Sequence, residues 1–134
     1  MINEFSVSKA LLDHLKTISG LPAIAIENVS FTPVVGQPYL REQDYSGMTQ
    51  APTLAADGFQ RKDGLYRVGV FVPKDNGKFN ALAYCDLIIA GFARGTVLTQ
   101  AGQKVRIEQS DREQGFIDGE WFQCGVTVRY TVIN

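Results

Sequence analysis

Few residues in this chain are of the types that catalyse reactions. His14 is the only histidine, and it lies beside Asp13 in a segment with helical periodicity. A Ser–His–Asp triad would have to use this histidine, but the sequence lacks the glycine-flanked serine turn that usually carries the nucleophile. We therefore interpret His14 as a solvated helix residue, and we expect no catalytic residues and no enzymatic activity.

Metal and cofactor sites also lack their usual motifs. Cys85 and Cys124 are not arranged as CxxC pairs, and a single histidine cannot complete a common zinc ligand set. The glycines do not form a phosphate-binding loop that ends in lysine. We expect no metal and no cofactor, and we interpret the two cysteines as buried free thiols.

Two charged features remain for contacts with a partner. Arg61 and Lys62 form a small basic cluster, which we expect at a solvated hairpin tip or against an acidic partner. Asp86 lies on an apolar helix stripe, four residues after Leu82 and three before Ile89. A carboxylate in such a place needs a hydrogen-bond donor. We predict that Asp86 forms a structural or inter-subunit salt bridge.

The bulk composition indicates one globular domain over residues 1–134. Apolar residues make up 45% of the chain and charged residues 20%, which is typical of a folded protein rather than a disordered one. Thirteen Lys and Arg residues against fourteen Asp and Glu give a net charge of −1, so we expect no nucleic-acid specificity. We find neither a signal peptide nor an apolar run of membrane-spanning length, and we expect no membrane partner.

The elements are organised around residues 64–95. The strand expected over 64–72 is apolar on both faces, which predicts a central strand. Asn76-Gly77 then predicts a turn, and a helix follows over 78–93. This helix is apolar nearly all round, so we expect burial on more than one side, by a second helix, a subunit interface or both.

Other segments complete an α+β fold. A first helix over 3–18 is capped by Asn3 and shows an apolar face that includes Phe5 and Leu15. Asp63-Gly64 and Asp118-Gly119 predict hairpin turns, and residues 126–132 alternate as a strand. The order of these elements predicts a mostly antiparallel (mixed) β-sheet with two main helices packed on one face.

Two segments between the helices are candidates for contacts. Residues 39–45 alternate poorly, which indicates a strand that projects into solvent or meets a partner. Residues 46–58 are rich in small and polar residues, and we expect a long flexible loop there. A small binding module that uses residues 39–58 as a lid over a ligand or peptide is therefore one hypothesis.

The strand, turn and helix of residues 61–98 resemble those of tail terminator (tail completion) proteins of long-tailed bacteriophages, the minor tail protein U-like group. Phe31-Thr32-Pro33, Pro38 to Arg41 and Val126 to Val128 fit the same group. The positions that carry the likeness are Gly64, Tyr66, Val68 and Val70 in the strand, Pro73 and Gly77 in the turn, and Asp86, Ile88 and Phe92 in the helix.

The resemblance implies a non-enzymatic structural subunit of a phage or prophage. Such a subunit forms a ring with copies of itself, typically a hexamer, that caps the tail tube and meets the head–tail connector protein. Its expected location is the host cytoplasm during assembly and the virion tail afterwards. The candidate interface residues are Tyr39, Arg41, Tyr45, Arg61, Lys62, Asp86, Leu87 and Ile88.

Overall fold

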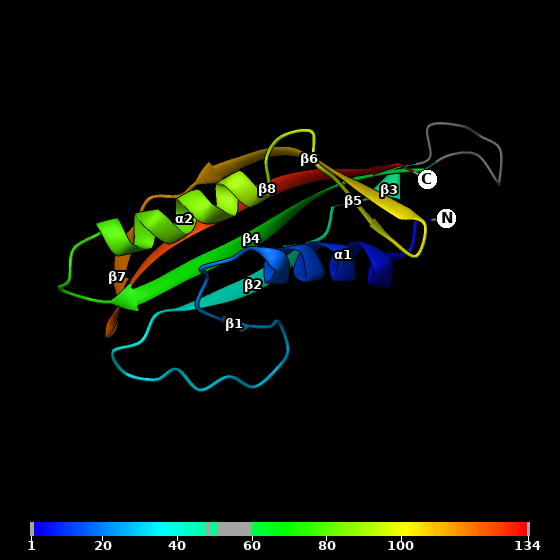
Figure 1. Cartoon of the computed structure of the whole chain (residues 1–134). Helices are drawn as coiled ribbons and strands as arrows, with labels where there is room; N and C mark the ends of the chain where they lie inside the picture. Colours follow the sequence, from blue (N-terminus) through cyan, green and yellow to red (C-terminus); the bar gives the residue numbers. More distant parts are fainter. Residues whose placement is uncertain (1, 48, 51–59, 134) are drawn as a thin grey trace.

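Two helices lie on the same face of one β-sheet in the computed structural model (Figure 1). The structure describes residues 2–47, 49–50 and 60–133. The predicted α+β class, with helices on one face of a mixed sheet, is confirmed. The elements are α1 (Glu4–Thr17), β1 (Ala23–Ala25), β2 (Tyr39–Tyr45), β3 (Thr49–Gln50), β4 (Arg61–Pro73), α2 (Phe79–Gly91), β5 (Val97–Gln100), β6 (Gln103–Arg112), β7 (Phe116–Asp118) and β8 (Trp121–Ile133).

Strands β4 and β8 form the spine of the sheet. They pair antiparallel over all thirteen residues of each strand, and the strand order across the sheet is β1-β2-β4-β8-β6-β5. Short strands extend this order, with β3 on β4 and β7 on β8. Only the β1–β2 pair is parallel among the described strands. The prediction of a central strand over 64–72 is therefore confirmed.

The core lies between the two helices and the sheet. Alternate residues of β4 and β8 point towards the helices, as the period of two in these strands requires. Both helices bury one side against them. The fully buried side chains include Leu11 and Leu15 of α1, Cys85 and Ile88 of α2, Tyr66, Val68 and Val70 of β4, and Val126, Val128 and Val132 of β8.

Helix α1 begins as expected and packs through most of its predicted face, with Phe5 as the exception. The Asn3 side chain accepts a hydrogen bond from the backbone N–H of Ser6 at 3.0 Å, which confirms the predicted cap. The predicted burial of Phe5 is wrong, because its side chain is 73% exposed. Leu11 and Leu15 of the predicted face are buried, and Val7 extends their stripe at the four-residue spacing of one helix face.

The two Asp-Gly pairs have different structures. Asp118-Gly119 joins β7 to β8, and Gly119 has φ +60°, so this predicted hairpin is confirmed. The hairpin predicted at Asp63-Gly64 is wrong: both residues lie inside β4 and pair with Thr131 and Tyr130. Gly64 is needed there because a Cβ would approach the Tyr130 ring to 2.4 Å.

Helix α2 buries one side only within the chain. Ala81, Cys85 and Ile88 are fully buried, whereas Phe79 is 76% and Leu87 is 39% exposed. The predicted salt bridge of Asp86 is wrong for the subunit, because Asp86 is exposed and makes no ion pair with any described residue. Its place next to Leu87, on the outer side of the helix, explains this exposure.

No helix of the described part of the chain is long and apolar enough to cross a membrane.

Candidate assembly interface

Neither helix of the described residues covers the second face of the sheet, which carries half of the predicted interface residues. Tyr39, Arg41 and Tyr45 of β2 share this face with Arg61 of β4. We call it the open sheet face. Strand β2 pairs with β4 at all seven of its residues, so residues 39–45 are a fixed strand rather than a lid. Of the flexible loop expected near 46–58, residues 48 and 51–58 lie outside the described residues.

The other predicted interface residues lie elsewhere. Lys62 is fully buried on the helix side of the sheet, where its ammonium group pairs with Glu4. The expected hairpin tip is wrong for Lys62. Strand β4 begins at Arg61, and Lys62 pairs with Val132 of β8 inside the sheet. Ile88 is in the core, so neither residue is available to a partner. Asp86 and Leu87 are exposed on the outer side of α2, away from the open sheet face.

An aromatic cluster covers one end of the open sheet face. The rings of Tyr39 and Phe71 stack in parallel with their centroids 4.6 Å apart, and Trp121 meets Tyr39 edge-on at 5.1 Å. Phe31 of the β1–β2 connection packs on the same tyrosine. Tyr39 is only 5% exposed as a result, so it is a fixed part of the surface rather than a free anchor.

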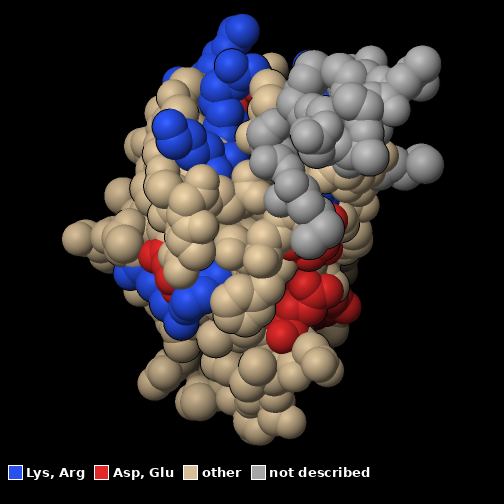
Figure 2. All heavy atoms as spheres, turned by 90° about the vertical axis from the view of Figure 1, so that its right-hand side faces the viewer, with Lys and Arg blue, Asp and Glu red and all other residues tan. Residues whose placement is uncertain are grey.

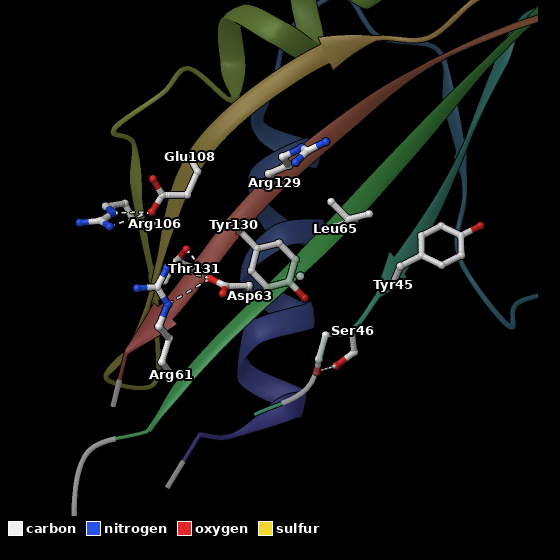
Figure 3. A pocket seen from close by; sticks show the side chains of 12 residues that line it. Tyr45, Ser46, Arg61, Asp63, Leu65, Arg106, Glu108, Arg129, Tyr130 and Thr131 are labelled. Carbon is white, nitrogen blue, oxygen red and sulfur yellow. Dashed lines mark hydrogen bonds and ion pairs between the residues drawn. The ribbon is translucent and has the colours of Figure 1, made fainter. Parts of the chain in front are cut away.

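The opposite end of this face is hollowed. A depression of about 600 Å³ lies between β2, β4, β8 and β6. Figure 3 shows Arg61, Asp63 and Thr131 in contact at one side of it, Leu65 and Tyr45 at the other, and α1 behind the sheet. Asp63 accepts a hydrogen bond from Thr131 at 2.9 Å and faces the Arg61 guanidinium at 3.3 Å. The hollow therefore combines apolar side chains with oriented charges.

The cations around this hollow are only partly neutralised. Arg106 pairs with Glu108 at 2.8 Å, and this hydrogen bond lowers the pKa of the Glu108 carboxyl. Arg129 is exposed and makes no ion pair with the described residues. Figure 2 views the end of the molecule where both termini lie, and it shows that Lys and Arg atoms and Asp and Glu atoms form largely separate groups there.

One ion pair in the middle of the open sheet face depends on two glycines. Arg67 Nε donates to Glu113 Oε2 at 2.9 Å, and Thr127 Oγ1 donates to the same oxygen at 3.1 Å. A Cβ on Gly125 would lie 2.9 Å from the Arg67 guanidinium, and one on Gly69 would lie 3.0 Å from it. The paired glycines thus leave room for this salt bridge, which was not predicted from the sequence.

Three carboxylates gather at the β1–β2 edge of the sheet, and this group was not predicted from the sequence either. The backbone N–H of Glu27 donates to Glu42 Oε1 at 3.2 Å, and that of Asp44 donates to Glu27 Oε1 at 3.2 Å. Glu42 is only 4% exposed, and burial raises the pKa of its carboxyl. The poor alternation of residues 39–45 was the available signal, since it placed Glu42 and Asp44 on one face with Leu40.

His14 and the two cysteines make contacts inside the fold. His14 is half-buried, with its Nε2 atom 2.6 Å from the Gly91 carbonyl and its ring edge-on to Phe92. Its interpretation as a solvated residue is therefore wrong, because it joins α1 to the end of α2. Cys85 and Cys124 are buried free thiols, as expected, with their Sγ atoms 3.7 Å apart.

Comparison with known proteins identifies the family. No curated protein matches the chain. One solved protein, whose name states no function, covers 96% of this chain and 91% of its own length with a TM-score of 0.73. At 23% identity this likeness shows a shared fold alone. A family model described as phage tail terminator protein matches residues 6–130. Since this match spans nearly the whole chain, the chain belongs to the phage tail terminator family, whose members are structural components of phage tails.

Proposed function

We propose that this chain is a tail terminator subunit that assembles into a ring, expected to be a hexamer, at the end of the phage tail tube. The ring ends polymerisation of the tube protein and then offers a surface to the head–tail connector protein. The proposed role of the ring is to bind these proteins rather than to catalyse a reaction. Assembly takes place in the host cytoplasm, and the finished ring is part of the virion tail.

The observation that carries this proposal, beside the family match, is the open sheet face. Layered α+β proteins normally cover a sheet face or leave it polar. Here Tyr45, Leu65 and Ile133 are 51%, 39% and 50% exposed on that face. Exposed aromatic and aliphatic side chains accompanied by arginines are typical of a subunit interface, in which aromatic residues and Arg are enriched.

A ring requires two different surfaces on each subunit. Neighbours in a ring meet head-to-tail, so one surface of a subunit contacts another surface of the next. We assign the open sheet face, with Tyr39, Arg41, Tyr45 and Arg61, to the contact between subunits. The outer side of α2, with Asp86 and Leu87, is then free to contact the tube or the connector protein.

The proposal is tested by measuring the mass of the assembly. Light scattering over a concentration series, with and without the tail tube protein, is expected to show a ring, which negative-stain microscopy would image. Leu65→Asp should prevent ring formation, because it places a charge in an apolar contact. Leu87→Asp is the matched control and should leave the ring intact. A chain that stays monomeric under every condition would refute ring assembly.

A further inference from the structure

The three carboxylates at the β2 edge lie beside a groove. This groove, of about 480 Å³, is lined by Phe5, Ser8, Lys9 and Leu12 of α1 and by Ile26 to Asn28 and Glu42 opposite. We call it the acidic groove. Its only cation among the described lining residues is Lys9, which already pairs with Asp13 at 3.3 Å. The charges of Glu27, Glu42 and Asp44 are therefore not neutralised by the described part of the chain.

A buried hydroxyl lies close to the Glu42 carboxylate of this groove. The Tyr66 side chain is fully buried, and its hydroxyl makes no hydrogen bond with the described residues. Tyr66 and Asp44 are partners in the β2–β4 register, and the Glu42 carboxylate lies close enough to influence the Tyr66 hydroxyl. Burial, and then the nearby Glu42 carboxylate, raise the pKa of the Tyr66 hydroxyl.

The groove also has an apolar rim. Phe5 is 73% exposed although it lies on the side of α1 that faces the groove. The described acidic residues are not clustered in a way that could hold a metal ion. A side chain with a cationic head and a long apolar stem fits such a site, because its stem packs on Phe5 while its head meets the carboxylates.

The complementary surface lies on the open sheet face of the same chain. Two adjoining hollows, of about 600 and 200 Å³, share Arg106 and Thr131 in their linings. Their charged linings are Arg61, Lys104, Arg106 and Arg129 against Asp63 and Glu108, which leaves a net charge of +2. Arg129 and Lys104 are exposed and have no carboxylate partner among the described residues.

We propose that the acidic groove of one subunit receives the surface around Arg129 and Lys104 of the next subunit in the ring. This proposal rests on the proposed ring function, and it specifies the two surfaces that meet between neighbouring subunits. The groove lies at the β1–β2 edge on the helix side, whereas Arg129 is on β8 and on the opposite face. Two unlike surfaces on different sides of a subunit give the head-to-tail contact that a closed ring requires. The opposite charges fix the register of the neighbours and speed their association.

Cysteine cross-linking tests the contact directly. Glu27→Cys and Arg129→Cys are made in separate chains, each at an exposed position. Glu27 contacts β2, and two strand spacings separate β2 from β8, about 10 Å, which is too far for a disulfide within one chain. A mixture of the two variants should give covalent dimers under mild oxidation, and neither variant alone should do so. A chain with both changes should give a ladder up to the full ring.

A second pair of positions controls for chance collisions. Lys78→Cys and Glu120→Cys are also exposed but lie outside both surfaces. This pair should give no ladder at the same concentration. If it links as fast as the Glu27 and Arg129 pair, or if that pair does not link at all in rings seen by microscopy, the proposed contact is overturned.

Charge reversal supplies a measurement that does not depend on cysteines. Arg129→Glu and Glu27→Arg should each raise the concentration for half-assembly by about tenfold, and the double variant should recover most of this loss. Lys78→Glu is the matched control and should assemble like the unchanged chain. Rings that form equally well in both reversed variants would refute this contact alone, whereas a chain that never forms rings would refute the proposed function as well.

Discussion

Tyr130 of β8 donates a hydrogen bond from its hydroxyl to Asp44 Oδ1 of β2 at 2.7 Å, across the strand that separates them. Its ring lies over Gly64 of that intervening strand, where any Cβ would collide with it. The Tyr130 side chain thus connects β8, β4 and β2 beside the acidic groove. The position of Asp44 beside the groove depends on this contact, which links the stability of the sheet to the proposed interface.

Removal of this hydroxyl should destabilise the subunit. Tyr130→Phe keeps the ring over Gly64 but deprives Asp44 of a donor, so we expect the free energy of unfolding to fall by about 1–2 kcal/mol. Denaturant unfolding followed by the fluorescence of Trp121, the single tryptophan, measures this change. Tyr45→Phe is the control, because the Tyr45 hydroxyl bonds Gln43 on the surface, and its loss should cost less than about 0.5 kcal/mol.

The close approach at Gly64 gives a second prediction. Gly64→Ala should cost about 1–3 kcal/mol, since a Cβ would lie 2.4 Å from the Tyr130 ring. The cost should largely disappear in a Tyr130→Ala background, because the ring that causes the collision is gone. A double-mutant cycle of unfolding free energies measures this coupling. Additive effects would show that the strain at Gly64 has another source.

The buried carboxyl of Glu42 predicts a pH dependence. Burial raises its pKa above the unfolded value, so this group stabilises the fold when protonated and loses that contribution as pH rises through the folded pKa. Glu42→Gln stays neutral and can still accept the Glu27 N–H. It should therefore raise the free energy of unfolding of the dissociated subunit at pH 7, and the gain should shrink as pH falls towards about 4.

The matched variant is Glu108→Gln, for which the expected change in the free energy of unfolding at pH 7 has the opposite sign. The Arg106 hydrogen bond lowers the pKa of Glu108, so this carboxylate stabilises the fold above its unfolded pKa and loses that effect as pH falls. Glu108→Gln should therefore be slightly destabilising at pH 7, and only slightly because the pair is exposed to solvent. If Glu42→Gln proves to be destabilising at pH 7, the burial argument for Glu42 is wrong.

The thiols should be protected in the folded state. Burial raises the pKa of Cys85 to about 12, and Cys124 close by adds to this effect, so the thiol is protonated at neutral pH. Alkylation of both cysteines at pH 7 should be slow and limited by unfolding. Mass spectrometry after timed labelling measures it, and complete labelling within seconds under native conditions would contradict the core placement.

Local patterns predicted the elements better than the contacts between them. The alternation at 126–132 and the Asn3 cap depend on neighbouring residues, and both are found in the structure. Asp63-Gly64 and Asp118-Gly119 look alike in sequence, yet only the second is a turn. The difference comes from Tyr130, which is 66 residues after Gly64 and packs on it, and no short pattern contains that contact.

Local patterns also predicted which candidate interface residues share a face, but not which of them are buried by residues distant in sequence. Tyr39, Arg41, Tyr45 and Arg61 share a face because residues two apart along a strand do so. The predicted place of Lys62 was wrong, since its partner Glu4 is 58 residues away in sequence. The acidic groove could not be predicted, because it requires α1, the β1–β2 connection and β2 to meet in space.

The central claim is that this chain ends the growth of a tail tube. The most direct measurement is the length distribution of tubes that form from purified tail tube protein, with and without this chain, imaged by negative-stain microscopy. We predict short tubes with a ring at one end and a mean length that falls as more chain is added. Tubes of unchanged length with bare ends, in the presence of excess folded chain, would contradict the claim.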